Sequence, residues 1–345
     1  MPLHKPYKHH AILVLPRIRV QNANAISSPL TWGFPSITAF MGLATALARR
    51  IQADTENTAL SGIALNGSIG VVCHGFDAQV TEGGYTHSFC LTRNPLLSNG
   101  ASAAIVEEGR AHLDITLVLE VSINDALLND EPRAQCAAAI REHLAAMRIA
   151  GGSVMPNQHP HHKKPSIVLL PDDSEKREKE FKRLARQWLP GFVLVGRDDL
   201  LQPSLQSSSH FSLLDSWLKH AQLTYRATKN ESNGAIEWKR DERKGWLVPI
   251  PVGYAALSEL HPVGSVAGAR DSGVPFRFVE SVYSIGEWVS PHRLRNAEQM
   301  LWRTQFDADK GLYRCVNTYR PPAPIASFAL EEASESEFVD FENWN

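Results

Sequence analysis

Residues 10–20 read HAILVLPRIRV, and this stretch decides how the chain begins to fold. Its first half is an apolar run, and its second half alternates, with Ile18 expected to face inward and Arg17 and Arg19 outward. An alternation of period two is typical of a β-strand with one polar face. The chain is therefore expected to start with a strand that carries a basic edge or face.

A helix is expected after the polar loop QNANAISSPLTWGFPS, which begins at Gln21. Ser36 can cap its first turn, and apolar residues then recur at helical spacing. The expected helix runs from Ser36 to about Ile51, with these buried positions: Ile37, Phe40, Met41, Ala44 and Leu47.

The next elements complete an order of strands and helices. Further strands are expected at about 68–80, 85–91 and 113–121, and an Ala-rich helix at 132–147 ends before Gly151 and Gly152. Glycine readily adopts the left-handed backbone that ends a helix. The order β-α-β-β-α, followed by an expected β-strand, is that of split βαβ or RRM-like folds, whose open sheet binds RNA in many proteins.

The second half has a different character. A charged helix is expected at 172–189, a strand at 192–195, a helix at 212–222 and a surface loop at 228–245, and the rest is rich in Pro, Gly and aromatic residues. The predicted fold class is α+β. We expect an RRM-like or ferredoxin-like domain over 8–170 with a long excursion at about 92–112, an irregular α+β lobe over 171–325 packed on it, and an acidic, disordered tail over 326–345.

Composition limits the class of protein. The 345 residues are 43% hydrophobic, enough to bury a core. No apolar run approaches the ~20 residues that span a bilayer, and only five apolar residues precede Pro16, too few for a secretory signal. The four cysteines form no C-x-x-C pair, so neither a zinc knuckle nor a disulfide framework is indicated. A cytoplasmic protein without contact to a membrane is expected.

The net charge of −2 conceals an uneven distribution. Six of the 37 acidic residues lie in 331–345, and without them 31 acids face 35 basic residues, a balance of +4. A mildly cationic body permits phosphate binding in a local groove but is far from the strongly basic composition of a general nucleic-acid binder. The tail itself is expected to be a solubilising end or a segment that binds a partner.

Polar loop residues are the first candidates for binding. Gln21, Asn22 and Asn24 carry amides that can bind base edges or phosphates, although turn chemistry explains them better when they are taken alone. Trp32 could stack on a base, but a core tryptophan that packs the loop on the helix is the more frequent outcome.

The excursion and the glycine pair provide the other candidates. The excursion holds Arg93, Asn94, Arg110 and His112, a composition suited to a hairpin that lies across RNA, or to an ordinary solvated hairpin. Arg148 precedes Gly151 and Gly152, which would let the backbone approach a phosphate closely, or would simply end the helix.

Catalysis and metal binding receive little support from spacing. There is no P-loop, G-x-S-x-G or H-E-x-x-H motif. His159, His161 and His162 form a cluster that is poor in carboxylates and is followed by two lysines, so a surface loop is preferred to a metal site. No metal, cofactor or catalytic residue is predicted.

Several long strings carry a more specific resemblance. They occur in order from about residue 11 to residue 315: LPRIRVQNANAISSPLTWGFPS, LTRNPL, AAIVEEGRAHL, AMRIAGGS, LPGFVLV, GWLVPIPVGYAALS, RFVE, GEWVSPHR and DKGLYR. Together they resemble the second Csy subunit of type I-F CRISPR complexes, within the Cas-five superfamily.

The resemblance implies a non-catalytic RNA-binding subunit of an antiviral ribonucleoprotein. Such a subunit has an RRM-like body with a projecting thumb, here about 92–112, and it caps the 5′ handle of the CRISPR RNA. It pairs with the large Csy subunit as a heterodimer, abuts the first backbone Csy subunit, and meets target DNA through the complex. The handle-binding surface would include Arg17, Arg19, Gln21, Asn22, Asn24 and Arg148, and Arg277, Arg293 and Arg295 could extend it or touch DNA.

Other functions stay open. Some relatives in the superfamily process the guide precursor, so the chain could be a metal-independent endoribonuclease that uses His112 or His74 as a general acid or base. A scaffold that mainly binds protein partners through its aromatic residues is compatible with the RNA cap. The sequence does not separate a defence system from a transposon-linked one.

Overall fold

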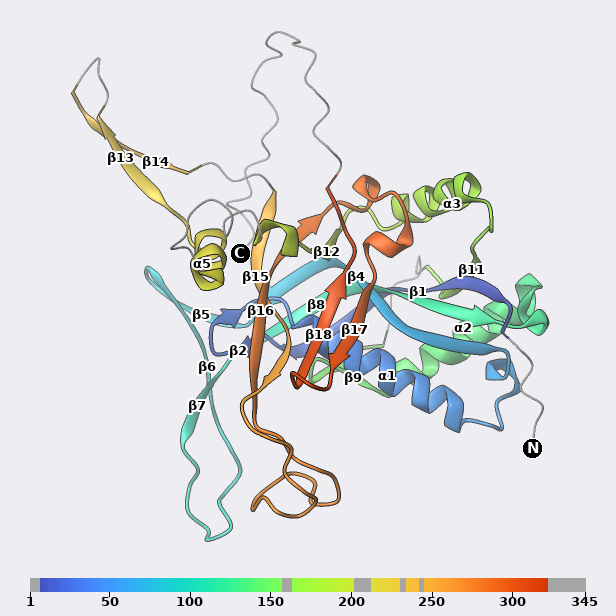
Figure 1. The fold of residues 1–345 in the computed structure, drawn as a ribbon, viewed down its shortest axis with the longest axis horizontal. Helices are drawn as coiled ribbons and strands as arrows, with labels where there is room; N and C mark the ends of the chain where they lie inside the picture. The colour runs from blue at the N-terminus through green and yellow to red at the C-terminus, as the bar shows by residue number, and fades with distance from the viewer. Residues whose placement is uncertain (1–6, 157–162, 202–211, 230–233, 242–244, 322–345) are drawn as a thin grey trace.

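The computed structural model describes residues 7–156, 163–201, 212–229, 234–241 and 245–321. Most strands of this part join one antiparallel sheet in the order β12-β16-β15-β18-β17-β4-β8-β1-β10-β9, with β11 paired to β1 (Figure 1). Helices cover both faces of this sheet, so the protein is a mixed α+β structure, as predicted.

The strand β1 (His9–Asn24) is the centre of the first half. It pairs with β8 (Arg110–Ile123), β10 (Gly152–Val154) and β11 (Ser166–Leu169), and β8 pairs in turn with β4 (Ile63–Ala78). Leu13 and Leu15 belong to one hydrophobic cluster, whereas Ile12 and Val14 belong to another. The strand is apolar without interruption in its first half because both faces are buried there.

One face of the sheet is covered by α1 (Ile37–Ala53) and α2 (Asp130–Ala145). The predicted cap of α1 is confirmed, since Ser36 Oγ accepts a hydrogen bond from the Thr38 amide. Ser36 Oγ also donates to the Pro251 carbonyl at 3.0 Å, which joins the start of α1 to β15. All five predicted apolar positions of α1 are buried.

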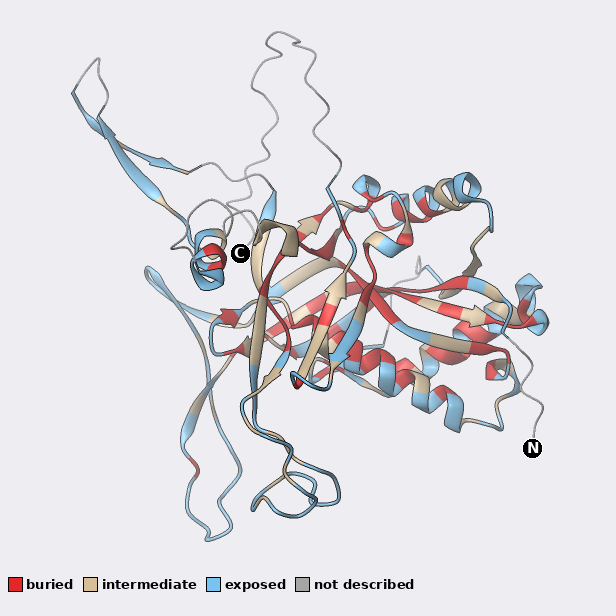
Figure 2. Ribbon diagram, in the orientation of Figure 1, coloured by how far each residue is buried: buried red, intermediate tan, exposed pale blue. Residues whose placement is uncertain are grey.

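The other face is covered over part of its length by α3 (Ser174–Arg186) and the short helices η4 (Pro291–Arg293) and η5 (Ala297–Gln299). Phe181 and Trp188 pack edge to face above Ile12 and Val14, at a ring distance of 5.8 Å. Figure 2 shows the resulting arrangement, with buried residues concentrated along the central sheet and helix faces that meet it.

Strands from the second half extend the same sheet. They are β12 (Phe192–Gly196), β15 (Trp246–Ala256), β16 (Val279–Val289), β17 (Trp302–Asp307) and β18 (Leu312–Asn317). Because β12 pairs with β4 as well as with β16, these strands and β4 form a closed ring. The proposed division between residues 170 and 171 stays a prediction.

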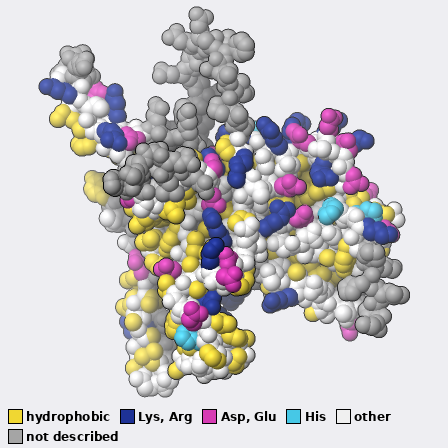
Figure 3. All heavy atoms as spheres, viewed as in Figure 1, with side chains coloured by type: hydrophobic (Ala, Val, Ile, Leu, Met, Phe, Trp, Pro, Cys, Tyr) yellow, Lys and Arg dark blue, Asp and Glu magenta, His cyan; other side chains and the backbone are white. Residues whose placement is uncertain are grey.

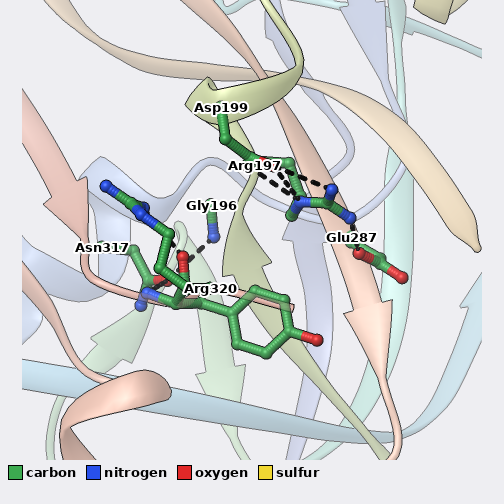
Figure 4. Close-up of polar contacts among 7 residues, drawn as sticks. Gly196, Arg197, Asp199, Glu287, Asn317 and Arg320 are labelled. Carbon is green, nitrogen blue, oxygen red and sulfur yellow. Dashed lines mark hydrogen bonds and ion pairs between the residues drawn. The ribbon is translucent and has the colours of Figure 1, made fainter. Parts of the chain in front are cut away.

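A buried polar network joins β12 to β16 and the C-terminal strand (Figure 4). Arg197 binds Asp199 at 2.9 Å and also binds the buried Glu287. Burial alone would lower the pKa of Arg197, but the hydrogen bonds and charges of Asp199 and Glu287 outweigh it and raise the pKa. The Gly196 amide donates to Asn317 Oδ1 at 3.1 Å, which ties β12 to the end of β18.

Two small sheets project from the main one (Figure 1). The first consists of β5 (Val80–Gly83), β6 (Thr86–Arg93) and β7 (Ile105–Glu108). It begins before the predicted start of the excursion at Thr92, and Arg110 and His112 lie beyond it in β8. The second, β13 (Tyr225–Lys229) with β14 (Ile236–Arg240), corrects the expectation of a surface loop at 228–245.

The remaining short elements complete the description. They are β2 (Ile26–Ser28), β3 (Thr31–Trp32), β9 (Arg148–Ile149), α5 (Leu213–Ala221) and the 3-10 turns η1 (Thr58–Leu60), η2 (Asp125–Leu127) and η3 (Asp198–Leu200). Within the described ranges, every helix is too short or too polar to cross a bilayer. The histidine cluster at 159–162 and the acidic tail lie outside the described residues.

Candidate nucleic-acid interface

The second half of β1 has one uncovered face. Ile18 and Val20 are buried against the α1 core, so Arg19 between them points to the opposite side of the sheet and is exposed. On β8, His112 lies between the buried Ala111 and Leu113 and also points to that side. We call the surface formed by Arg17, Arg19, Gln21 and His112 the open face.

Two bulges shape the open face. The pairing of β1 with β8 shifts between Leu15 and Ile18 and again between Val20 and Ala23. Arg17 at φ 51° and Asn22 at φ 57° have a left-handed backbone at these shifts. Residues other than glycine rarely adopt this conformation, and it is enriched at functional sites. Both bulged residues are predicted site residues.

The charges of the open face are partly balanced. Arg17 Nη1 lies 3.2 Å from Asp114 Oδ2, with both side chains partly exposed. Arg19, Gln21 and His112 line a depression of about 200 Å³ together with Met155. The backbone amide of Asn22 donates to His112 Nδ1 at 3.1 Å, which leaves Nε2 of the neutral ring as a donor. The face therefore presents amide, imidazole and guanidinium donors.

Arg110 and Arg148 meet at the turn between β9 and β10. Arg148 Nη1 donates to the Gly151 carbonyl at 3.3 Å, and a Cβ added at Gly151 would lie 3.9 Å from Arg110 Nη1. Arg110 also pairs with Glu108 at 2.7 Å. Gly152 is buried, and a Cβ there would lie 2.7 Å from the backbone of Gln21 and Ala23. The glycine pair therefore permits close backbone packing in addition to the turn.

Asn24 makes local turn contacts, whereas Trp32 is exposed to solvent. The Asn24 side chain donates to the Ile26 carbonyl at 2.7 Å and accepts from the Ile26 amide at 3.2 Å, which is the turn chemistry expected from the sequence. Trp32 does not take the core placement weighed against base stacking, because it is 63% exposed, and its predicted contact with RNA stays a prediction. Its ring contacts Phe89 of β6 edge to face at 5.7 Å, beside the base of the projecting sheet.

Other predicted residues lie away from the open face. Arg93 ends β6 and Asn94 follows it, both exposed on the projecting sheet. Arg277 lies beside the turn at Gly311, next to β15. Arg293 and Arg295 are exposed beside α3. Arg293 belongs to η4, which contacts α3, and the charge of Arg295 acts on Glu178 of α3. In Figure 3, charged side chains of both signs alternate over this region rather than forming one basic patch.

His74 is poorly placed for acid–base catalysis. Its Nδ1 donates to the Pro190 carbonyl at 2.7 Å, so Nε2 must accept from Thr116 Oγ1 at 2.8 Å. Burial lowers the pKa of His74, which favours this neutral form. Among the described residues, no group of three or more His, Cys, Asp or Glu side chains could hold a metal ion.

A groove without a signal in the sequence lies beside the β9–β10 turn. About 720 Å³ in volume, it is lined by residues from β1, the start of α1, the β9–β10 turn and two tyrosines: Asn24, Ser27, Pro35, Ser36, Thr38, Ala39, Ala150, Gly151, Tyr254 and Tyr313. We call it the tyrosine groove. The two tyrosines lie about 60 residues apart in the sequence and meet only through the pairing of β15 with β18.

Comparison with known proteins identifies the family. The model of the family described as CRISPR-associated protein (Cas_Csy2) matches residues 13–315. The chain belongs to the Csy2 family. It is 44% identical over 317 residues to "CRISPR-associated protein Csy2" of Pseudomonas aeruginosa (strain UCBPP-PA14), covering 88% of this chain and 94% of that protein.

Membership confirms the resemblance to type I-F CRISPR proteins that the sequence strings indicated. As a member of this family, the chain is a subunit of the Csy complex. The matched range includes the open face, the projecting sheet β5–β7 and all ten residues that line the tyrosine groove.

Proposed function

We propose that this chain is a non-catalytic RNA-binding subunit that caps the 5′ handle of the CRISPR RNA in a type I-F complex. The observation that carries the proposal is the uncovered half of β1, where arginine and amide side chains lie on an open sheet surface. Unpaired RNA offers phosphates and base edges that such donors can bind.

The connectivity of the first half supports an RRM-like body. Its strands lie in the order β4-β8-β1-β10, with α1 and α2 on one face, which corresponds to a split βαβ arrangement. In such proteins the face without helices binds RNA. Here α3 covers part of that face, and the open face is the part that remains available.

The projecting sheet β5–β7 is the proposed thumb. It carries Arg93 at the end of β6 and Asn94 after it, and the exposed Trp32 of β3 contacts Phe89 at its base. An exposed aromatic ring beside cationic groups is a common way to hold single-stranded nucleic acid. We expect the thumb to lie along the RNA where the backbone Csy subunit follows, and the large Csy subunit to pair with this chain and bring target DNA to the complex.

The proposal is tested by reconstituting the chain with the large Csy subunit and a labelled guide RNA. We expect guide RNA to be retained only when it has its 5′ handle. Retention that is equal without the handle would contradict the proposal.

The same preparation separates binding from catalysis. We expect the retained RNA to stay intact, because both ring nitrogens of His74 are occupied and no metal cluster lies among the described residues. Cleavage of repeat RNA by this chain, abolished by His112→Ala, would move the assignment to an endoribonuclease.

A further inference from the structure

The tyrosine groove is an open depression that is large enough for one small ligand. Its volume of about 720 Å³ lies in the usual range of such pockets, roughly 300–1,000 Å³. Its lining comes from the end of β1, the start of α1 and the β15–β18 pair, and α1 packs against β15 and β18 in the fold (Figure 1). The groove is therefore built from segments of both halves of the chain.

An aromatic shelf forms one wall. Tyr254 and Tyr313 are directly paired across β15 and β18, with ring centroids 6.4 Å apart and planes inclined by 27°. Tyr313 is half-buried and supports the shelf, whereas Tyr254 is 41% exposed. Exposed aromatic faces are the usual platforms for unpaired bases.

Polar groups opposite the shelf are held in place by their own hydrogen bonds. Ser27 Oγ accepts from the Ser36 amide at 2.9 Å, and the Asn24 amide is fixed by the backbone of Ile26. Asn24 Nδ2 has two hydrogens, and within the described residues one of them is used. The other can donate to the edge of a base on the tyrosine shelf.

The charge distribution matches a nucleotide rather than a charged peptide. The ten residues that line the groove carry no charge. Two guanidinium groups lie at its rim beside Gly151: Arg148 donates to the Gly151 carbonyl, and Arg110 binds Glu108 through Nε and Nη2 and has Nη1 near Gly151. An uncharged aromatic interior with arginines at its edge suits a base inside and its phosphate at the rim.

We propose that the tyrosine groove binds one unpaired nucleotide of the guide RNA, with its base on Tyr254 and its phosphate at Arg110 and Arg148. This inference rests on the proposed RNA-binding function. It adds a base pocket beside the open face, reached past the β9–β10 turn, and it makes Tyr254 a binding residue.

The test uses the complete complex assembled on guide RNA with wild-type chain, Tyr254→Ala or Tyr254→Phe. Removing the ring lowers affinity for handle RNA on the order of tenfold, as expected for one lost base stack, whereas phenylalanine keeps affinity within about twofold. Tyr225→Ala, which removes a more exposed tyrosine from the β13–β14 hairpin, leaves affinity unchanged.

Ultraviolet crosslinking of the same complexes locates the nucleotide. Digestion and mass spectrometry yield an RNA adduct on the peptide that holds Tyr254 or Tyr313. Unchanged affinity of Tyr254→Ala with adducts confined to other peptides overturns the groove inference and leaves the proposed function standing. A groove that crosslinks to another protein subunit also overturns it, whereas loss of all handle-dependent retention in the wild type refutes the proposed function itself.

Discussion

At the scale of single residues, Arg19 is the clearest cation of the open face. It is exposed on β1 between two buried residues, and its neighbour Arg17 is tied to Asp114. The sequence predicted the outward direction of both arginines from alternation alone. It could not predict that Arg17 and Asn22 would have a left-handed backbone, because bulges depend on the register with β8.

Arg19→Ala is expected to weaken handle RNA binding several-fold. If Arg19 binds one phosphate, the slope of log affinity against log salt should decrease in magnitude by about 0.7. Titrations at several salt concentrations measure this. Arg49→Ala removes an equally charged, exposed side chain from α1, which covers the opposite face of the sheet, and should leave the slope unchanged. Equal effects of both variants would argue against the open face as the binding surface.

His74 is expected to make stability depend on pH. Burial lowers its pKa below the ordinary value of 6.5, so the unfolded chain binds the proton more readily. Neutral His74 adds to the free energy of unfolding above pH 6.5, and this stabilisation is lost as the pH falls toward the lower pKa of the folded state. His74→Gln keeps a donor for the Pro190 carbonyl and should flatten this dependence. Melting temperatures across that pH range would show an unchanged profile if His74 does not contribute.

At the scale of elements, local signals predicted the helices well. Ser36 caps α1, and Ser212 forms a capping box with Asp215 at the start of α5. The sequence did not decide whether Trp32 is buried, and the structure leaves its ring exposed. The hairpin β13–β14 was not predicted, because the pairing of exposed strands is decided by tertiary surroundings. The tyrosine groove had no local signal, since its tyrosines meet only across β15 and β18.

The β9–β10 turn is expected to require Gly152. A Cβ there would approach backbone atoms of Gln21 and Ala23 at 2.7 Å, so Gly152→Ala should cost about 1–3 kcal/mol and disturb the turn that holds Arg148. Gly42→Ala is the matched change: it lies in α1 with no atom near the new methyl group and should stabilise the protein by up to about 1 kcal/mol. Chemical denaturation compares the two, and the same sign for both would contradict the packing argument.

At the scale of the whole molecule, the two halves share one sheet, and within the second half a buried ion network joins the end of β12 to β16. Glu287→Ala leaves the buried Arg197 without one of its partners, and we expect a loss of roughly 3 kcal/mol in unfolding free energy. Glu280→Ala, at an exposed position of the same strand, should change it by less than about 0.5 kcal/mol. A small effect at Glu287 would mean that the network does not hold β12 on β16.

The central claim is that this chain caps the 5′ end of the guide RNA. The most direct measurement is digestion of 5′-phosphorylated guide RNA by a 5′→3′ exonuclease in complexes assembled with and without this chain. We expect the handle to resist digestion only when the chain is present, and we expect Arg19→Ala and Tyr254→Ala to shorten this protection. A handle digested equally in both complexes, or protection confined to the 3′ end, would contradict it.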